Sequence, residues 1–269
     1  MRCVRSWSVL APLALLLGAL FLGALPSAAA WADDFRIQTD VYAAKSKIPL
    51  SQNTTLFRAG YVYDYLTHPQ RATSVDRVAV FDKAHGRFIV LDPARKVKAE
   101  VKTDEVLLFA SKQQEFVTAK SSNAFNKFAV DPEFETDFSQ DGELKMTSPH
   151  MTYELKTIPA NTPEAAAQYR EFSDWYGRFN TMSNPGSTPP FARMAVNAEL
   201  VKRGLVPTEV HLTVPTQSGV KAASLRSEHH VAWRLLPRDA ERIEETANQL
   251  ATFKLVDFDQ FERTKLMKR

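Results

Sequence analysis

The chain of 269 residues has almost no cysteine: its only one is Cys3. A single cysteine forms no internal disulfide and supplies no cluster of thiolates for a metal ion. Disulfide-stapled scaffolds and cysteine metal sites are therefore excluded. A chain of this length can bury a sizeable core without such staples.

Glycine motifs and paired histidines are also missing. The nine glycines are scattered and never form a phosphate-binding G-x-G-x-x-G or G-x-x-x-x-G-K loop, and no serine lies in a G-x-S-x-G elbow. No two of the six histidines have the helical i, i+4 spacing of a zinc site, and His229 and His230 are adjacent in a predicted strand, so they point to opposite faces. We therefore expect no cofactor, no metal site and no enzymatic activity.

Charge of one sign is lacking too. The formal net charge of +3 includes Arg2 and Arg5 of a predicted leader, so the remaining chain is close to neutral. This excludes the basic field that nucleic-acid binding needs. Apart from one apolar run, from Val9 to Leu25, no segment approaches the roughly 20 apolar residues that span a bilayer. We expect no membrane span in the mature chain.

The N-terminal run is typical of an export signal, because two arginines precede it and small residues follow it. Ala30-Trp31-Ala32 predicts cleavage before Asp33, although Ala28-Ala29-Ala30 also fits and would leave Trp31 first. Cys3 lies before the apolar run, whereas a lipid-anchored exported protein carries its cysteine just after it. We therefore predict a signal peptide over residues 1–32, one domain over 33–269, and a periplasmic or secreted location.

The segment from Thr54 to Val101 predicts a meander of short antiparallel strands. Tyr61, Tyr63 and Tyr65 alternate with other residues, so they share one face of a strand. The runs 78–81 and 88–91 are apolar on both faces, which indicates strands covered on two sides. Further patterns predict an opening strand over 35–41, strands between 134 and 156 that are separated by turns at 140–142 and 148–149, and strands over 206–214 and about 221–235, with a turn near 217–219.

Several amphipathic helices accompany these strands. The first begins at Thr103 and has Val106, Phe109, Ala110, Phe116 and Val117 on one side. The second begins at Thr162-Pro163, where threonine caps the helix and proline takes its first position. A third runs from after Pro190 to a stop at Gly204, and a fourth opens at Pro237 with Ala240, Ile243, Ala247 and Leu250 on one face. In the tail, Leu255, Phe258 and Phe261 are placed to dock on the body.

Aromatic side chains are the candidate binding residues. Large apolar groups, some with polar handles, line many lipid-binding concavities. The residues that we single out are Tyr61, Tyr63, Tyr65, Phe172, Trp175, Phe179 and Trp233. The alternative is that they only fill the core between helix and sheet.

The export signal, the strands containing VYDYL and VFDKAHGRFIVLDPARKVKAEV, and the helices that follow resemble the periplasmic lipoprotein-carrier (Lol-type) superfamily. The resemblance covers the pattern from Phe35 to Ile158. It implies an α+β fold in which a curved, mostly antiparallel, half-open β-barrel sheet carries helices on its concave face and can hold an acyl chain. The strand at the start of the mature chain departs from the family, whose members begin with a helix.

The leading hypothesis is a non-enzymatic envelope protein that binds an apolar or lipid-like ligand, such as a lipid or acyl chain, in the curved sheet. The alternative is an envelope scaffold with a filled core whose partner is another envelope protein. A third hypothesis is a hydrolase with acids beside His211 or His230. Arg226, Glu228 and His230 lie at period two, which we interpret as a salt-bridged, solvated strand face. The sequence carries no signal for an oligomeric state.

Overall fold

The computed structural model describes residues 34–43, 45–71, 74–184, 187, 189–216 and 222–266. The predicted signal peptide over 1–32 and the predicted turn near 217–219 lie outside the described residues. The strands are β1 (Phe35–Ala43), β2 (Ser51–Arg58), β3 (Tyr61–Thr67), β4 (Val75–Asp82), β5 (Arg87–Asp92), β6 (Val97–Lys102), β7 (Glu135–Phe138), β8 (Glu143–Thr147), β9 (Thr152–Pro159), β10 (Leu205–Val214), β11 (Ala223–Ala232) and β12 (Lys254–Leu255). The helices are α1 (Thr103–Lys120), α2 (Ala124–Val130), α3 (Pro163–Ser183), α4 (Phe191–Lys202), α5 (Pro237–Thr252) and α6 (Phe258–Leu266), and a short 3-10 turn, η1, spans Pro69–Arg71.

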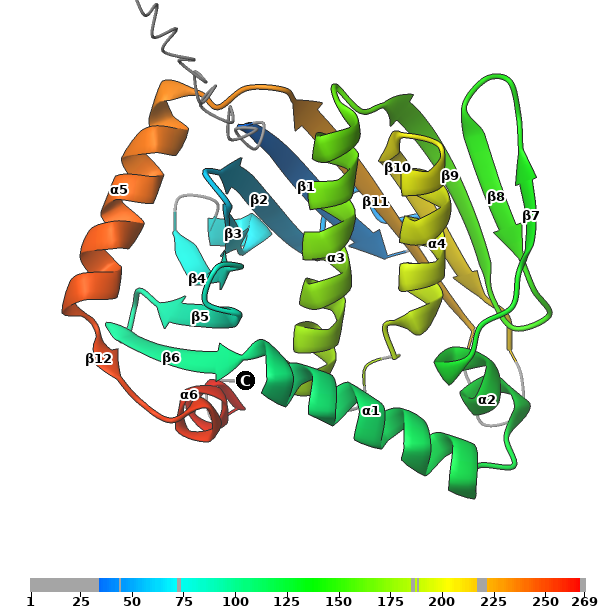
Figure 1. The fold of residues 1–269 in the computed structure, drawn as a ribbon, viewed down its shortest axis with the longest axis horizontal. Coiled ribbons are helices and arrows are strands. Elements are labelled where there is room, and N and C mark those ends of the chain that lie inside the picture. Colours follow the sequence, from blue (N-terminus) through cyan, green and yellow to red (C-terminus); the bar gives the residue numbers. More distant parts are fainter. Residues whose placement is uncertain are drawn as a thin grey trace, which may run out of the picture. The chain divides into compact units, whose positions relative to one another are not determined.

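All twelve strands belong to one sheet, in the order β12-β6-β5-β4-β3-β2-β1-β11-β10-β9-β8-β7. Every neighbouring pair is antiparallel except β12 and β6. The sheet does not close, because β12 and β7 each have one neighbour only (Figure 1). The predicted α+β class with an open, mostly antiparallel sheet is therefore confirmed. The opening strand β1 lies in the middle of the sheet, between β2 and β11.

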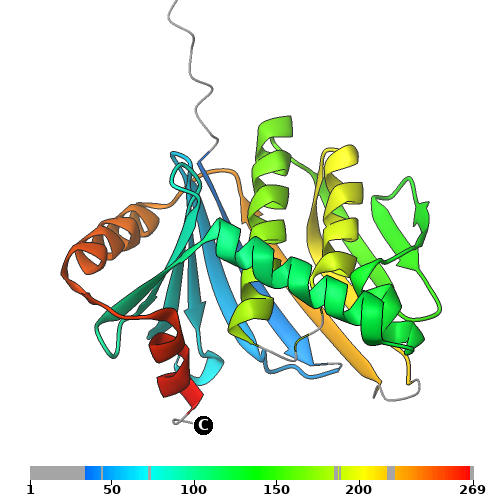
Figure 2. The ribbon, with the colours of Figure 1, turned by 60° about the horizontal axis from the view of Figure 1, so that its bottom comes forward.

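One face of the sheet bends around α3 and α4, and we call it the concave face (Figure 2). A single buried cluster on this face joins side chains from β6 across the sheet to β8, including Val101, Phe81, Phe35 and Leu144. Phe172 of α3 packs into the same cluster. The concave face thus holds the main core of the protein.

The opposite, convex face is covered by α5 over strands β2 to β5 (Figure 2). Within β4, Phe81 points to the concave cluster, whereas Val80 joins a second cluster beneath α5. This confirms the prediction that the doubly apolar strands are covered on two sides. The expectation that the helices lie on the concave face was wrong for α5, because strands that are apolar on both faces need a cover on each.

The buried side of α5 also differs from the prediction. Ile243 and Leu250 pack against the convex cluster as expected, but Ala240 and Ala247 are exposed. Thr246 is buried in their place, and its hydroxyl lies 2.9 Å from the hydroxyl of Tyr65. A polar contact therefore replaces a small apolar one at the centre of this interface.

Helix boundaries follow the predicted capping signals. The Thr162 side chain accepts a hydrogen bond from the amide of Ala165 (3.1 Å) at the start of α3, and Gly204, with φ +66°, ends α4. The sequence reading missed α2, although the Asn123 side chain caps it by accepting from the amides of Phe125 and Asn126. Its seven residues are too few to show a helical period.

Two apolar side chains have a different environment from the predicted one. Phe116 of α1 is 60 % exposed. The buried residues of this helix are Val106 and Ala110, so the helix packs over its first half and Phe116 lies beyond the contact. In the tail, Phe261 of α6 is buried as predicted and Phe258 packs against the concave cluster, but Leu255 is 57 % exposed. Leu255 lies in the edge strand β12, which leaves its side chain uncovered.

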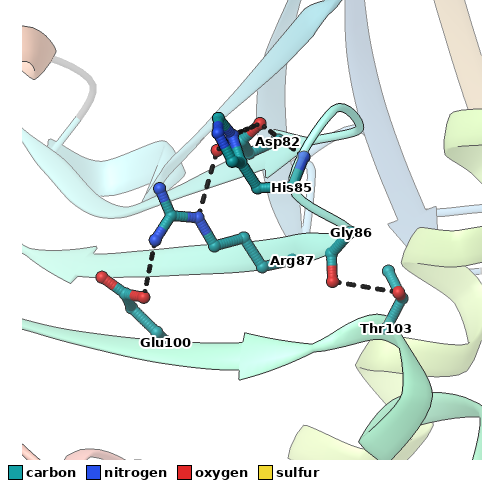
Figure 3. Close-up of polar contacts among 6 residues, drawn as sticks. All are labelled: Asp82, His85, Gly86, Arg87, Glu100 and Thr103. Atoms are coloured by element: carbon teal, nitrogen blue, oxygen red, sulfur yellow. Dashed lines mark hydrogen bonds and ion pairs between the residues drawn. The ribbon is translucent and has the colours of Figure 1, made fainter.

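The turn between β4 and β5 is held by a charged network (Figure 3). Asp82 accepts hydrogen bonds from the His85 imidazole (2.8 Å) and from Nε of Arg87 (3.1 Å), and Arg87 also donates to Glu100 of β6 (2.8 Å). Burial alone would raise the pKa of Asp82, but these hydrogen bonds hold it below its usual value. The carbonyl of Gly86 accepts from the backbone and hydroxyl of Thr103, which ties the turn to the start of α1.

Replacing Gly86 by alanine is expected to lower the free energy of unfolding by about 1–2 kcal/mol, because φ is +56° there. An added Cβ would also lie 3.1 Å from the Thr103 hydroxyl. Gly60→Ala is the matched control, since Gly60 has φ +81° but no heavy atom within 4 Å of an added Cβ. Urea denaturation of both variants measures the difference. An equal loss would show that the Thr103 contact adds nothing to the backbone strain.

Candidate ligand-binding site

The seven candidate aromatic residues lie on two faces of the sheet. Tyr61, Tyr63 and Tyr65 share one face, as predicted, but it is the convex face beside α5. Phe172, Trp175, Phe179 and Trp233 all belong to the concave cluster. Because the sheet separates the two groups, the seven side chains do not line one concavity.

The convex tyrosines are part of the α5 interface. Tyr65 is 3 % exposed, and burial raises the pKa of its hydroxyl. The ring centroids of Tyr61 and Tyr63 lie 6.2 Å apart, and both side chains are half-buried. Burial also raises the pKa of Tyr63. These contacts account for the three tyrosines as packing between a strand and a helix.

The concave aromatic residues form an apolar layer between α3 and the sheet. Phe172 meets Phe57 of β2 edge to face, with ring centroids 5.8 Å apart, and Phe179 stacks on Phe88 of β5 at 4.7 Å. At the other end of the layer the half-buried Trp233 lies 5.5 Å from Phe35 of β1. The layer thus extends over β1, β2 and β5 beneath one helix.

Further along the same strands, the concave positions turn polar. Four adjacent strands contribute to what we call the polar row: Asp64 of β3, Asn53 and Thr55 of β2, Thr39 of β1, and Ser227 and His229 of β11. The register places Thr39 opposite both Asn53 and His229, and Thr55 opposite Asp64. The row therefore crosses the sheet as one band beside the aromatic layer.

One half of the row surrounds a buried carboxyl group. Asp64 is 3 % exposed and accepts hydrogen bonds from the Asn53 amide and the Thr55 hydroxyl, both at 2.7 Å. Burial raises the pKa of Asp64, while these bonds and one from the Tyr176 hydroxyl oppose the rise. With three donors directed at it, this carboxyl is internally satisfied.

The other half of the row centres on His229. Its Nδ1 lies 3.0 Å from the Thr39 hydroxyl and its Nε2 lies 2.9 Å from the Ser227 hydroxyl. Burial, together with the smaller effects of Arg193 and His230, lowers the pKa of His229 to about 3, so the ring is neutral at ordinary pH. A neutral ring donates from one nitrogen and accepts at the other. One of the two hydroxyls, of Thr39 or of Ser227, therefore accepts a hydrogen bond from the ring and can donate its own proton to another partner.

Arg193, near the start of α4, adds a positive charge above this histidine. It donates to the Tyr169 hydroxyl of α3 (2.9 Å) and acts electrostatically on both His229 and the buried Tyr153 of β9. In the part of the chain that the structure describes, no carboxylate forms an ion pair with Arg193. The guanidinium is half-buried. Arg193 thus places a cation among the hydroxyl groups near His229.

This end of the concave face is accessible. Thr39, Asn53, Ser227 and His229 are only half-buried, although they face the helices. The next concave positions on β1 and β11 are apolar: Val41 is half-buried, and Leu225, which pairs with Ala43, is 37 % exposed. We call Val41, Leu225 and the half-buried part of the polar row the open end.

Sequence reasoning did not single out this site. The sequence indicates no metal site at His229 and assigns no binding role to Ser227, Thr39 or Arg193. The available signal was the period of two: Ser227 and His229 share a strand face with Val231 and Trp233, so two polar groups continue an apolar face. Arg193, on a helix, had no such signal.

The other candidates are less suited to binding. On the convex face, His211 lies 2.5 Å from Glu209 and its side chain is 44 % exposed, while Arg226 bonds Glu228, as expected of a solvated, salt-bridged face. A hollow of about 600 Å³ lies between α2 and the turn before β9, where Lys127, Asp131 and His150 are among the lining residues. Over the described ranges, no three His, Cys, Asp or Glu side chains converge as a metal site would require. No helix among the described elements combines the length and apolar character of a membrane span.

Comparison with known proteins adds little to this geometry. No family model matches the chain, and no curated protein is similar to it. Among solved structures, the chain is similar to the crystal structure of a LolA superfamily protein from Nitrosomonas europaea, with 9 % sequence identity and a TM-score of 0.28 over 77 % of this chain and 89 % of that one. A likeness of this degree carries no argument about function, so the site has to be interpreted from its own residues.

Proposed function

We propose that the chain is a non-enzymatic envelope protein that binds an apolar or lipid-like ligand on the concave face of its sheet. The observation that carries the proposal is the open end, where accessible apolar and polar side chains lie next to a buried aromatic layer. Val41 and Leu225 flank the polar row on one side, and the aromatic layer flanks it on the other. Ligand sites commonly combine apolar walls with a few fixed polar groups.

The concave face carries apolar and polar side chains side by side, which suits a ligand that is itself part apolar and part polar. An apolar chain gains about 25 cal/mol for each Å² of apolar surface that it removes from water, whereas a polar group loses free energy on burial unless it finds a partner. Leu225 and Val41 provide apolar contacts for the chain of such a ligand. The Thr39 and Ser227 hydroxyls provide hydrogen-bond partners for its polar group. A ligand with both characters fits this surface better than a purely apolar or purely polar one.

The location and the non-enzymatic character belong to the same proposal. The predicted signal peptide over 1–32 supports export to the periplasm. His229 has hydroxyl partners at both nitrogens, and the Asp64 carboxyl is occupied by three donors, so neither is placed as a free general base. Carriage of a lipid or acyl chain is the corresponding role.

The test is native mass spectrometry of the chain from Asp33 onward, purified without detergent from a bacterial periplasm. We expect an added mass that leaves on denaturation, and saturable binding of an apolar fluorescent probe. Leu225→Asp places a carboxylate at the open end and is expected to weaken probe binding at least about tenfold, since an isolated charge is costly to bury beside an apolar ligand. Leu255→Asp, at a 57 % exposed site in β12, is the matched control.

An apo mass together with no probe binding would overturn the proposal, and the scaffold alternative would then remain. Equal weakening by Leu225→Asp and Leu255→Asp would show that the probe does not bind at the open end.

A further inference from the structure

We infer that the ligand carries an anionic head group and that Arg193 binds this group. The inference rests on the proposed function, because it specifies the chemistry of the same ligand. It starts from a half-buried guanidinium that has no carboxylate partner in the described part of the chain.

Two other arginines near the sheet have a carboxylate partner. Arg77, on the concave face of β4, pairs with Glu262 of α6 at 2.9 Å, and Arg36, on the convex face, lies 3.6 Å from the buried Asp239. Among the residues that the structure describes, the hydrogen-bond partner of Arg193 is the Tyr169 hydroxyl, a neutral acceptor. A partly buried charge gains free energy when an opposite charge approaches it, so this position favours an anion from outside the chain.

The groups around Arg193 are suited to the same ligand. Tyr169 already contacts the guanidinium, and the Thr39–His229–Ser227 chain ends in a hydroxyl whose proton is free to bond an acceptor. Asp64, an acid on the same face, is shielded by its own three donors and its Coulombic partner is Arg77. Asp174 of α3, which accepts from Asn197 of α4 at 2.7 Å, pairs with Arg170 rather than with Arg193. Arg193 thus lies among neutral donors, and the nearest acids have other partners.

The apolar side chains of the open end and the cation of Arg193 together indicate the class of ligand. A planar guanidinium has several N–H donors in a fixed fork that matches carboxylate and phosphate oxygens. An apolar chain would occupy the open end beside Leu225, while its acidic group would meet Arg193. Fatty acids and acidic phospholipids share this chemistry, and the experiment is designed to tell a carboxylate from a phosphate.

The experiment measures the affinity of the mature chain, freed of endogenous ligand, for dodecanoate, dodecyl phosphate and dodecanol by isothermal titration calorimetry below micellar concentrations. These probes share one alkyl chain and differ in the head group. We expect at least one of the two anions to bind tenfold or more tightly than the alcohol, the usual scale of a charge-assisted hydrogen bond. The stronger anion identifies the head-group type. Inorganic phosphate alone is expected to bind at least tenfold more weakly than dodecyl phosphate.

Arg193→Met should abolish this preference and leave the affinity for dodecanol within about twofold, because the methionine stem keeps the apolar contacts. Arg193→Lys should keep part of the preference, since the charge remains and the fork is lost. Arg226→Met is the matched control: it removes one positive charge from the convex side of β11, where Arg226 bonds Glu228, and should leave the preference unchanged.

The outcomes separate the two proposals. If none of the three alkyl probes binds, the proposed function itself fails. If dodecanol and the anions bind equally, the function stands and the anionic head group is refuted. If the preference for an anion survives Arg193→Met, the anion binds elsewhere and the assignment of Arg193 is wrong.

Discussion

Replacing Phe179 by alanine is expected to lower the free energy of unfolding by about 3–5 kcal/mol, the range for a buried aromatic residue in a core. Phe179 is 2 % exposed and stacks on Phe88, with ring centroids 4.7 Å apart and planes inclined by 12°. Its ring also lies 5.8 Å from that of Phe258 and beneath the guanidinium of Arg77. The substitution would therefore weaken the attachment of α3 and of α6 at one point.

Phe116→Ala is the control for this measurement, because it removes the same side chain from a helix position that is 60 % exposed. We expect a loss below about 0.5 kcal/mol there, as at other surface sites. Urea denaturation followed by far-UV circular dichroism gives both values under one set of conditions. A loss at Phe179 no larger than at Phe116 would mean that the contact between α3 and β5 contributes little to the stability of the fold.

Much of the fold could be predicted because its signals are local. Thr162-Pro163 marks the start of α3 through a capping oxygen and a fixed φ, and Gly204 marks the end of α4 through its positive φ. Alternation in β1 and β9 shows which side chains share a face, and the register of the sheet agrees with it. Such signals depend on a few neighbouring residues.

The placement of each face could not be predicted in the same way. Tyr61, Tyr63 and Tyr65 share a face by period two, but nothing local states whether α3 or α5 covers it. Phe116 fits the apolar side of its helix, yet α1 contacts its neighbours over Val106 and Ala110 and leaves Phe116 exposed. Both outcomes depend on contacts between segments far apart in the chain.

The candidate site was hidden for the same reason. Thr39 and His229 lie 190 positions apart, and only the pairing of β1 with β11 brings them together. Arg193 joins them because α4 packs over this part of the sheet. Each of these residues is unremarkable within its own segment. The polar row forms only when the strands pair into the sheet.

His229 is expected to make the protein sensitive to acid. Burial lowers its pKa from 6.5 to about 3 in the folded state, and the groups that act on it electrostatically are Arg193 of α4 and the adjacent His230. Tyr169 of α3 and Tyr153 of β9 face the same region, and burial raises the pKa of Tyr153. Between pH 6.5 and 3 the unfolded chain therefore binds a proton at this position that the folded chain does not.

The sign of the effect follows from this difference. Stability rises with pH wherever the unfolded state binds more protons, so the contribution of His229 is lost as the pH falls below 6.5, at up to about 1.4 kcal/mol per pH unit. We expect the free energy of unfolding of the wild type to fall by about 2 kcal/mol more between pH 7 and pH 5 than that of His229→Gln. The raised pKa of Asp64 acts in the opposite direction, but it is common to both proteins and cancels in the comparison.

His230→Gln is the matched control, because His230 lies on the same strand with its side chain on the convex, exposed face. Urea denaturation at pH 7, 6 and 5 should give this variant a pH dependence much closer to that of the wild type than to that of His229→Gln, because burial, and not His230, is the main cause of the lowered pKa of His229. If His229→Gln also kept the wild-type slope, His229 would titrate as an exposed histidine does, and the hydroxyl contacts of Thr39 and Ser227 would not hold it neutral. A shallower slope in His229→Gln alone would mean that the polar row enters ligand binding with an uncharged imidazole, which leaves Arg193 to supply the positive charge.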